Sequence, residues 1–299
     1  MSNFELNWVI EIEDAGKLLR EFLREKRVSK TALTNIKFQG GRILVNRQEV
    51  TVRYTLERDD QVKIEFPIEE KSESMIGERI PLDIIFEDDT ILIVNKPAGM
   101  NTIPSRKDPT GSLANAIVGH YQQIGLCSTV HVVTRLDRDT SGLVLIAKHR
   151  HTHHLLSEDQ KNGLVNRYYE VFVHGRIEGF GSIEEPIGRN IDSIIEREVR
   201  EDGQYAYTEY QTLSIFDEFS HMRIKLKTGR THQIRVHMAH VGHPLLGDTL
   251  YGGSDELMAR QALHCCWISL IHPVINEKMD FSSKLPDDMQ KIVEDRVCN

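Results

Sequence analysis

The sequence lacks the features that would place it in a specialised class of protein. Its longest apolar runs, such as Leu143–Ala147, are far shorter than the roughly 18 residues that a membrane-spanning helix requires. The first residues mix polar, acidic and apolar types, unlike a secretory signal peptide. With 9 Pro and 20 Gly among 299 residues, the composition is neither disordered nor collagen-like. We therefore expect a globular, cytoplasmic protein with no membrane partner.

Cysteine is also scarce, with four residues in the chain: Cys127, Cys265, Cys266 and Cys298. None of them forms a C-x-x-C pair, and two are adjacent, which suits neither a disulfide framework nor a tetrahedral zinc site. Buried or idle thiols are the expected outcome.

Histidines are more numerous, and four of them cluster at His149, His151, His153 and His154. His149 and His153 are four residues apart and would share one face of a helix, as metal ligands can. No H-E-x-x-H pattern accompanies them. A solvent-exposed helix is therefore the preferred interpretation, and no metal site is expected.

Basic residues are few overall but unevenly distributed. The formal net charge is −8, yet residues 17–47 carry nine Lys or Arg against two Glu, a local charge of +7 that leaves −15 for the rest of the chain. This asymmetry indicates a small basic module attached to an acidic body.

The basic segment has its own structural pattern. Residues 14–40 predict two helices, the second capped by Ser29 and ended by Gly40-Gly41, and strands are expected at residues 42–46 and 61–66, with a turn at residues 47–49. The pattern resembles the alpha-L RNA-binding motif of ribosomal proteins. The helices would present one positive surface to phosphates, formed by Lys17, Arg20, Arg24, Lys26, Arg27, Lys30 and Lys37. A merely solvated helix face is the alternative.

Polar, acidic residues follow from Pro67 to Glu78 and indicate a linker. We predict an RNA-binding module at residues 1–68, a linker at residues 69–79 and a main domain at residues 80–299. The main domain has β-type runs at residues 84–86, 91–94, 143–147, 168–173, 208–213 and 222–226. Helices fall irregularly between them, which favours an α+β fold with a mixed or antiparallel sheet.

Two segments of the main domain are dense in polar side chains. In residues 133–143, Asp137 lies between arginines in a loop before an apolar strand. In residues 228–237, Arg235 adjoins the apolar face of a predicted helix. A buried arginine requires an acidic partner, and Asp137 is a candidate. On spacing alone, Asp137 could equally cap a turn or pair with Arg138.

These segments resemble the signatures of the RluA-type pseudouridine synthase family. The matching stretches are R-L-D-x-x-T-S-G-L at residues 135–143, K-P-A-G at 96–99, R-Y-Y-E-V-F-V-H-G at 167–175, G-R-T-H-Q-I-R-V-H at 229–237 and G-H-P-L-L-G-D at 242–248. The resemblance covers roughly residues 80–285 and keeps the family's order. Three positions depart from the usual pattern: Thr134 replaces a frequent histidine, Arg167 a lysine and Cys265 an alanine. The first two bear on substrate preference and the third on packing.

The resemblance implies isomerisation of uridine to pseudouridine within RNA, without a cofactor. Asp137 would be the catalytic carboxylate, acting as a nucleophile or a base, and Arg235 its partner. Tyr169 would stack on the uracil, and Arg135 would fill the space left by the flipped nucleotide. Lys96 and Arg167 would help to make the cleft basic toward RNA.

The same residues allow two other functions. A hydrolase built from Ser141, His232 and Asp137 lacks the G-x-S-x-G elbow of such enzymes. A non-catalytic RNA-binding or ribosome-assembly factor would keep the fold and only bind. The expected partner is RNA, with 23S ribosomal RNA favoured over transfer RNA, no DNA is expected, and a monomer is the simplest assembly.

Overall fold

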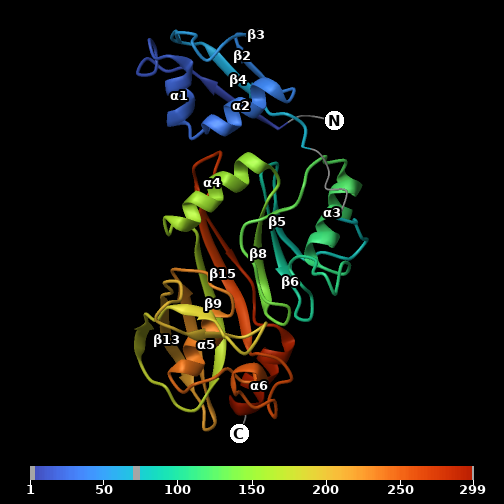
Figure 1. Ribbon diagram of the computed structural model, residues 1–299, viewed down its shortest axis with the longest axis vertical. Coiled ribbons are helices and arrows are strands. Elements are labelled where there is room, and N and C mark those ends of the chain that lie inside the picture. Colours follow the sequence, from blue (N-terminus) through green and yellow to red (C-terminus); the bar gives the residue numbers. More distant parts are fainter. Residues whose placement is uncertain (1–3, 70–74, 298–299) are drawn as a thin grey trace.

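The computed structural model describes residues 4–69 and 75–297, which form two packed units (Figure 1). Cys298 and residues 70–74 of the expected linker lie outside the described residues. The predicted boundaries at residues 68 and 79 stay a prediction. Among the described helices, none is long and apolar enough to cross a membrane.

The N-terminal unit is a four-stranded antiparallel sheet with two helices. Its strands are β1 (Glu5–Val9), β2 (Arg42–Val45), β3 (Gln48–Glu49) and β4 (Gln61–Glu65), in the order β1-β4-β2-β3. Its helices are α1 (Leu19–Glu25) and α2 (Lys30–Phe38). Ser29 caps α2 as predicted, since its hydroxyl accepts a hydrogen bond from the Ala32 N–H at 3.1 Å. Strands β1 and β3 were not predicted.

The second unit is built on a ten-stranded mixed sheet, in which the path β10-β13-β14-β9-β15-β8-β6-β5 is extended by β7 on β8 and β16 on β15. Its strands are β5 (Ile84–Glu87), β6 (Ile91–Lys96), β7 (His131–Val132), β8 (Ser141–Ala147), β9 (Asn166–His174), β10 (Phe180–Ile183), β13 (Thr208–Ile215), β14 (Phe219–Leu226), β15 (Leu263–Ile271) and β16 (Lys278–Ser282). Only β8 and β15 pair in parallel among the described strands. The predicted α+β class is confirmed.

Helices and a small hairpin complete this unit. The helices are α3 (Leu113–Ile124), α4 (Arg150–Lys161), α5 (Gln233–His240) and α6 (Asp287–Val297), with a 3-10 turn at Thr249–Tyr251. The hairpin consists of β11 (Ile187–Arg189) and β12 (Arg197–Val199). All six predicted β-type runs lie within observed strands, whereas β7, β10 to β12, β15 and β16 were not predicted. Strand β8 is buried along its whole length and lies at the centre of the core.

The helix α4 carries the histidine cluster and joins the two units (Figure 1). Arg27 of the N-terminal unit donates to Asp159 at 2.7 and 3.2 Å. The ring of Phe66 stacks on His151, with centroids 4.9 Å apart, and His151 is only 5% exposed. The expectation of a solvent-exposed helix is therefore wrong for this face of α4, because His149 and His151 stack on Phe4 and Phe66 of the N-terminal unit.

Acid is expected to weaken this junction through His151. Burial lowers the pKa of His151 from 6.5 to about 4, so the folded protein holds the ring neutral. The unfolded chain binds the proton first as the pH falls below about 6.5, and stability is lost progressively down to about pH 4. Between pH 7 and pH 5, the wild-type protein should lose roughly 2 kcal/mol of its free energy of unfolding through His151. His151→Phe, which keeps a ring for stacking, should remove this loss.

Urea unfolding at the two pH values measures this difference. His154→Gln, on an exposed position of the same helix, is the matched control and should keep most of the acid loss, because burial and not the charge of His154 is the largest cause of the lowered pKa of His151. An equal acid loss in wild type and His151→Phe would contradict the assignment to His151.

Candidate active site

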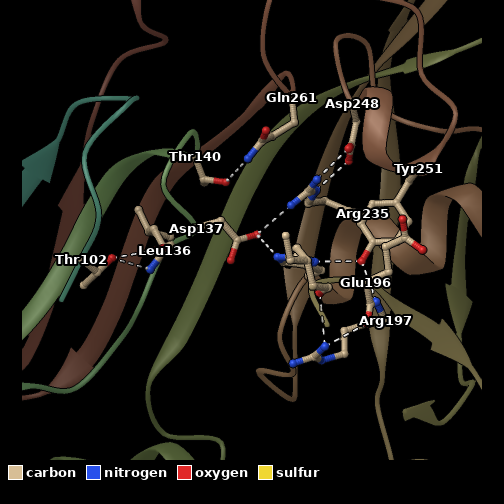
Figure 2. Close-up of polar contacts among 12 residues, drawn as sticks. Thr102, Leu136, Asp137, Thr140, Glu196, Arg197, Arg235, Asp248, Tyr251 and Gln261 are labelled. Atoms are coloured by element: carbon tan, nitrogen blue, oxygen red, sulfur yellow. Dashed lines mark hydrogen bonds and ion pairs between the residues drawn. The ribbon is translucent and has the colours of Figure 1, made fainter. Parts of the chain in front are cut away.

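The loop that carries Asp137 is held from both sides by backbone and hydroxyl contacts. The Thr102 hydroxyl donates to the Leu136 carbonyl at 2.6 Å and accepts from the Leu136 N–H at 3.2 Å (Figure 2). Further along, the Gln261 side chain donates to the Thr140 hydroxyl at 3.3 Å. These contacts lie on either side of Asp137 in sequence, and so fix where its backbone sits.

Lys96 belongs to the same support and not to the surface. It is 0% exposed, and its ammonium donates to the carbonyls of Pro97, Met100 and Arg138 at 2.8 to 3.0 Å. Burial lowers the pKa of Lys96 to about 7, while the charges of Asp139 and Asp137 oppose that shift. The expectation that Lys96 contacts RNA does not fit this position, because phosphates cannot reach an ammonium enclosed by backbone carbonyls.

Gly142, just after the loop, lets β8 run directly beside β15. It adopts a φ of 114°, and a Cβ there would lie 2.3 Å from the Cys265 carbonyl oxygen. No side chain fits at this distance. The glycine of the T-S-G-L segment is therefore required by strand packing.

The carboxylate of Asp137 faces the helix α5. Its side chain is 30% exposed, and its Oδ2 lies 3.5 Å from Nη1 of Arg235, whose side chain is 8% exposed (Figure 2). The predicted pairing of these two residues is present, but the contact is longer than an ordinary charge-assisted hydrogen bond. Asp137 is thus held near the cation and remains accessible.

The closer partner of Arg235 is Asp248, which sequence reasoning missed. Nε and Nη2 of Arg235 donate to its two carboxylate oxygens, each at 2.7 Å, and Asp248 is 1% exposed. Burial disfavours the guanidinium charge, but Asp248 and then Asp137 more than compensate and raise the pKa of Arg235. Asp248 ends the G-H-P-L-L-G-D segment, so the motif marked it without indicating its role.

Tyr169 of β9 is enclosed in the core behind the loop. It is 3% exposed and packs within the same cluster as Leu143 and Cys265. Burial is the largest cause that raises the pKa of the phenol above its ordinary value, and the Cys265 thiol, also buried, has its pKa raised to about 12. Both groups are therefore protonated at neutral pH.

Arg167 and Thr134, two of the positions that depart from the family pattern, are both buried. Arg167 is 5% exposed and donates to the Thr228 carbonyl at 3.4 Å, and its Nη2 would lie 3.0 Å from a Cβ at Gly229. The Thr134 hydroxyl accepts from the Leu145 N–H at 2.9 Å. Neither side chain lies on an open surface, whereas Arg135, next to Asp137, is exposed.

The hydrolase alternative does not fit the geometry. Ser141 is 3% exposed, and its hydroxyl lies 2.9 Å from Nδ1 of His264 instead of facing His232. A nucleophilic serine must be exposed to substrate. Ser141 is therefore a structural residue of β8.

Comparison with known proteins identifies the family. A sequence profile of the RNA pseudouridylate synthase family matches residues 90–240. The chain is 50% identical to an uncharacterized RNA pseudouridine synthase of Bacillus subtilis, YjbO, over 92% of this chain and 98% of that protein. The chain belongs to the RluA-type family of RNA pseudouridine synthases. It is accordingly an isomerase that acts on RNA.

Further relatives agree with this assignment. The ribosomal large subunit pseudouridine synthase D of Vibrio parahaemolyticus is 36% identical over 85% of this chain and 82% of its own length. The solved structure of human RNA pseudouridylate synthase domain containing 1 has the same fold, with a TM-score of 0.57 at 22% identity, over 75% of this chain and 97% of that one. The family profile spans Asp137, Tyr169 and Arg235, and ends just before Asp248.

Proposed function

We propose that this pseudouridine synthase modifies specific uridines of ribosomal RNA in the cytoplasm, with Asp137 as its catalytic carboxylate. The observation that carries the assignment is the partly exposed Asp137 carboxylate beside Arg235, a buried arginine fixed by Asp248. The ribosomal substrate rests on the relatives named for the large ribosomal subunit. The two kinds of support are independent of each other.

The reaction needs a group that acts on the ribose while the base turns. The bond between N1 of uracil and C1′ of the ribose breaks, a bond from C5 to C1′ forms, C5 loses a proton and N1 gains one. Asp137 acts on the sugar as nucleophile or base, with Nη1 of Arg235 3.5 Å from its Oδ2. Atoms and charge balance without a cofactor.

The family motifs also assign roles toward a flipped nucleotide to Tyr169 and Arg135. Tyr169 would stack on the uracil, and because its ring is only 3% exposed, this stacking requires the surrounding core to open when RNA binds. Arg135, two residues before Asp137, is exposed and would occupy the gap that an extruded nucleotide leaves in the RNA. The expectation that Arg167 contacts RNA does not fit its position, because the side chain is 5% exposed and donates to the Thr228 carbonyl.

The N-terminal unit supplies a second contact to RNA phosphates. Besides Arg27, five of its predicted contacts are exposed, namely Arg20, Arg24, Lys26, Lys30 and Lys37. Lys17 differs, because its ammonium lies 2.6 Å from Asp14 and 2.8 Å from Glu25, and these carboxylates neutralise it. Arg27 contacts α4 instead of a free surface.

The salt dependence of RNA affinity tests this surface. Arg20→Gln combined with Arg24→Gln should reduce the slope of log K against log salt by about 1.4 to 1.8, since each lost phosphate contact contributes about 0.7 to 0.9. Lys17→Gln is the matched control from the same unit and should change the slope little. Filter binding between 50 and 300 mM salt measures the slope. An unchanged slope in the double variant would exclude this surface from RNA binding.

A pseudouridine map of total cellular RNA tests the proposed function directly. Sites in ribosomal RNA should vanish when the gene is deleted, and should return with wild type but not with Asp137→Ala. Loss confined to transfer RNA would correct the substrate. No change in any RNA, together with inactive purified protein that still binds transcribed RNA, would support a non-catalytic binding factor.

A further inference from the structure

His232 lies next to Asp137 in an unusual backbone conformation. It immediately precedes α5 with a φ of 58°, in the left-handed region that few residues other than glycine adopt. Its side chain is 11% exposed, and its Nε2 lies 3.9 Å from Oδ2 of Asp137. Residues held in such conformations concentrate at functional sites, where the surrounding structure determines them.

Tyr251 holds the other side of the His232 ring. The Tyr251 hydroxyl accepts a hydrogen bond from the Arg197 N–H at 2.9 Å (Figure 2). The same hydroxyl lies 2.8 Å from Nδ1 of His232. The hydroxyl accepts from Arg197 and can at the same time donate its single proton to Nδ1. In that arrangement Nδ1 is an acceptor, and the proton of the neutral ring resides on Nε2, the nitrogen that faces Asp137.

We propose that His232 is a positioning residue for Asp137, with its Nε2–H kept in place by Tyr251. The contacts of His232 and Arg235 converge on the same oxygen, Oδ2 of Asp137. Among the described residues, no hydrogen bond reaches Oδ1, which is left for the substrate. Both contacts, at 3.9 and 3.5 Å, are long without substrate, as is common before catalytic hydrogen bonds tighten in the complex. This role deepens the proposed function and rests on it.

The charges around His232 agree with a neutral ring. Burial lowers the pKa of His232, and the charge of Asp137 opposes that shift. The groups that face the ring are Asp137, Asp248, Arg197, Arg235 and Tyr251. The two arginines lower its pKa further, so the Nε2–H tautomer, and not the imidazolium, is the form that matters at neutral pH.

Two substitutions separate positioning from a structural role. Glutamine at position 232 places its amide N–H₂ near the original Nε2, whereas asparagine reaches only the Nδ1 position and also tolerates the left-handed backbone. His232→Gln should therefore keep kcat within about threefold of wild type, while His232→Asn should lose about 20-fold with KM unchanged. If His232 only stabilised the fold, asparagine would be the milder change.

Tyr251→Phe tests the tautomer itself. Removal of the hydroxyl should lower kcat about fivefold and shift the ring toward a mixture of tautomers. The ¹⁵N chemical shifts of histidine-labelled protein report this mixture without any assay of activity, and the His232→Gln spectrum assigns the resonance. His240→Gln, on an exposed position of α5, and Tyr205→Phe, whose hydroxyl donates to Glu184 at the surface, are the matched controls.

The outcomes are distinct. The proposal is supported if glutamine retains activity, asparagine loses it and the wild-type ring carries its proton on Nε2. It is overturned if asparagine is as active as glutamine or more so, or if wild-type Nδ1 carries the proton. Wild-type protein that forms no pseudouridine would instead refute the proposed function, and the ¹⁵N spectra would still decide whether Tyr251 sets the tautomer.

Discussion

An Asp137→Asn variant is expected to lose more than about 10³-fold in kcat on its RNA substrate. Asparagine has the shape of aspartate, but it can neither act as a nucleophile toward the ribose nor accept a proton as a base. The Asp137 side chain is 30% exposed, and its nearest contact with Arg235 is 3.5 Å long, so the exchange should change the stability of the fold little. Tritium release from C5-labelled uridine measures the rate.

Binding and stability serve as controls for this variant. RNA affinity and the unfolding midpoint should stay close to those of wild type, because Arg235 keeps its 2.7 Å contacts with Asp248. A variant with kcat within tenfold of wild type would remove Asp137 from the mechanism. A variant that fails to bind RNA would show that the carboxylate organises the binding surface instead.

Asp248→Ala is expected to lower the free energy of unfolding by about 3 to 5 kcal/mol. The Arg235 side chain is 8% exposed, and the substitution would remove the bidentate partner of its guanidinium. An unpaired buried charge carries a cost of this size. Activity should fall with stability, because Arg235 would then turn toward Asp137 or leave the site. Urea unfolding monitored by circular dichroism measures the first effect.

A second ion pair provides the matched control. Arg260 and Asp288 form the same bidentate contact at 2.6 and 2.9 Å, but Asp288 is 48% exposed. Arg260, itself 12% exposed, would keep its hydrogen bonds to the Asp139 and Gln261 carbonyls, so Asp288→Ala should cost less than about 1 kcal/mol. The double variant Arg235→Met with Asp248→Leu should recover much of the stability and none of the activity. Equal costs for Asp248→Ala and Asp288→Ala would show that burial does not set the energy of the pair.

Local sequence patterns were sufficient for most of the secondary structure. Ser29 is a typical cap and does cap α2, and the apolar run at residues 143–147 is the buried centre of β8. Short strands with few apolar residues, such as β11 and β12, were missed because three residues carry no detectable period. The family motifs pointed to Asp137, Tyr169 and Arg235 because chemistry restricts which residue types can stand there.

Local sequence patterns did not predict which side chains are buried or which distant residues pair. Sequence placed Lys96 at an RNA surface, but the loop at residues 97–100 and the Arg138 carbonyl enclose its ammonium. The histidines of α4 were expected in solvent, and the N-terminal unit covers His151. In both cases the residue type was compatible with either environment, so only the arrangement of distant segments could decide.

The sequence by itself thus determined the family, the α+β class and the basic N-terminal segment, and it pointed to the candidate site residues, because each leaves a local pattern of charge, period or motif. The tertiary structure alone decided that Arg235 is held by Asp248, that His232 and Tyr251 stand behind Asp137, and that α4 is a junction. These facts depend on contacts between side chains far apart in the chain, such as Asp137 and Arg235, which are separated by 98 positions in the sequence. No local pattern encodes such distances, since they arise only when the strands and helices pack together.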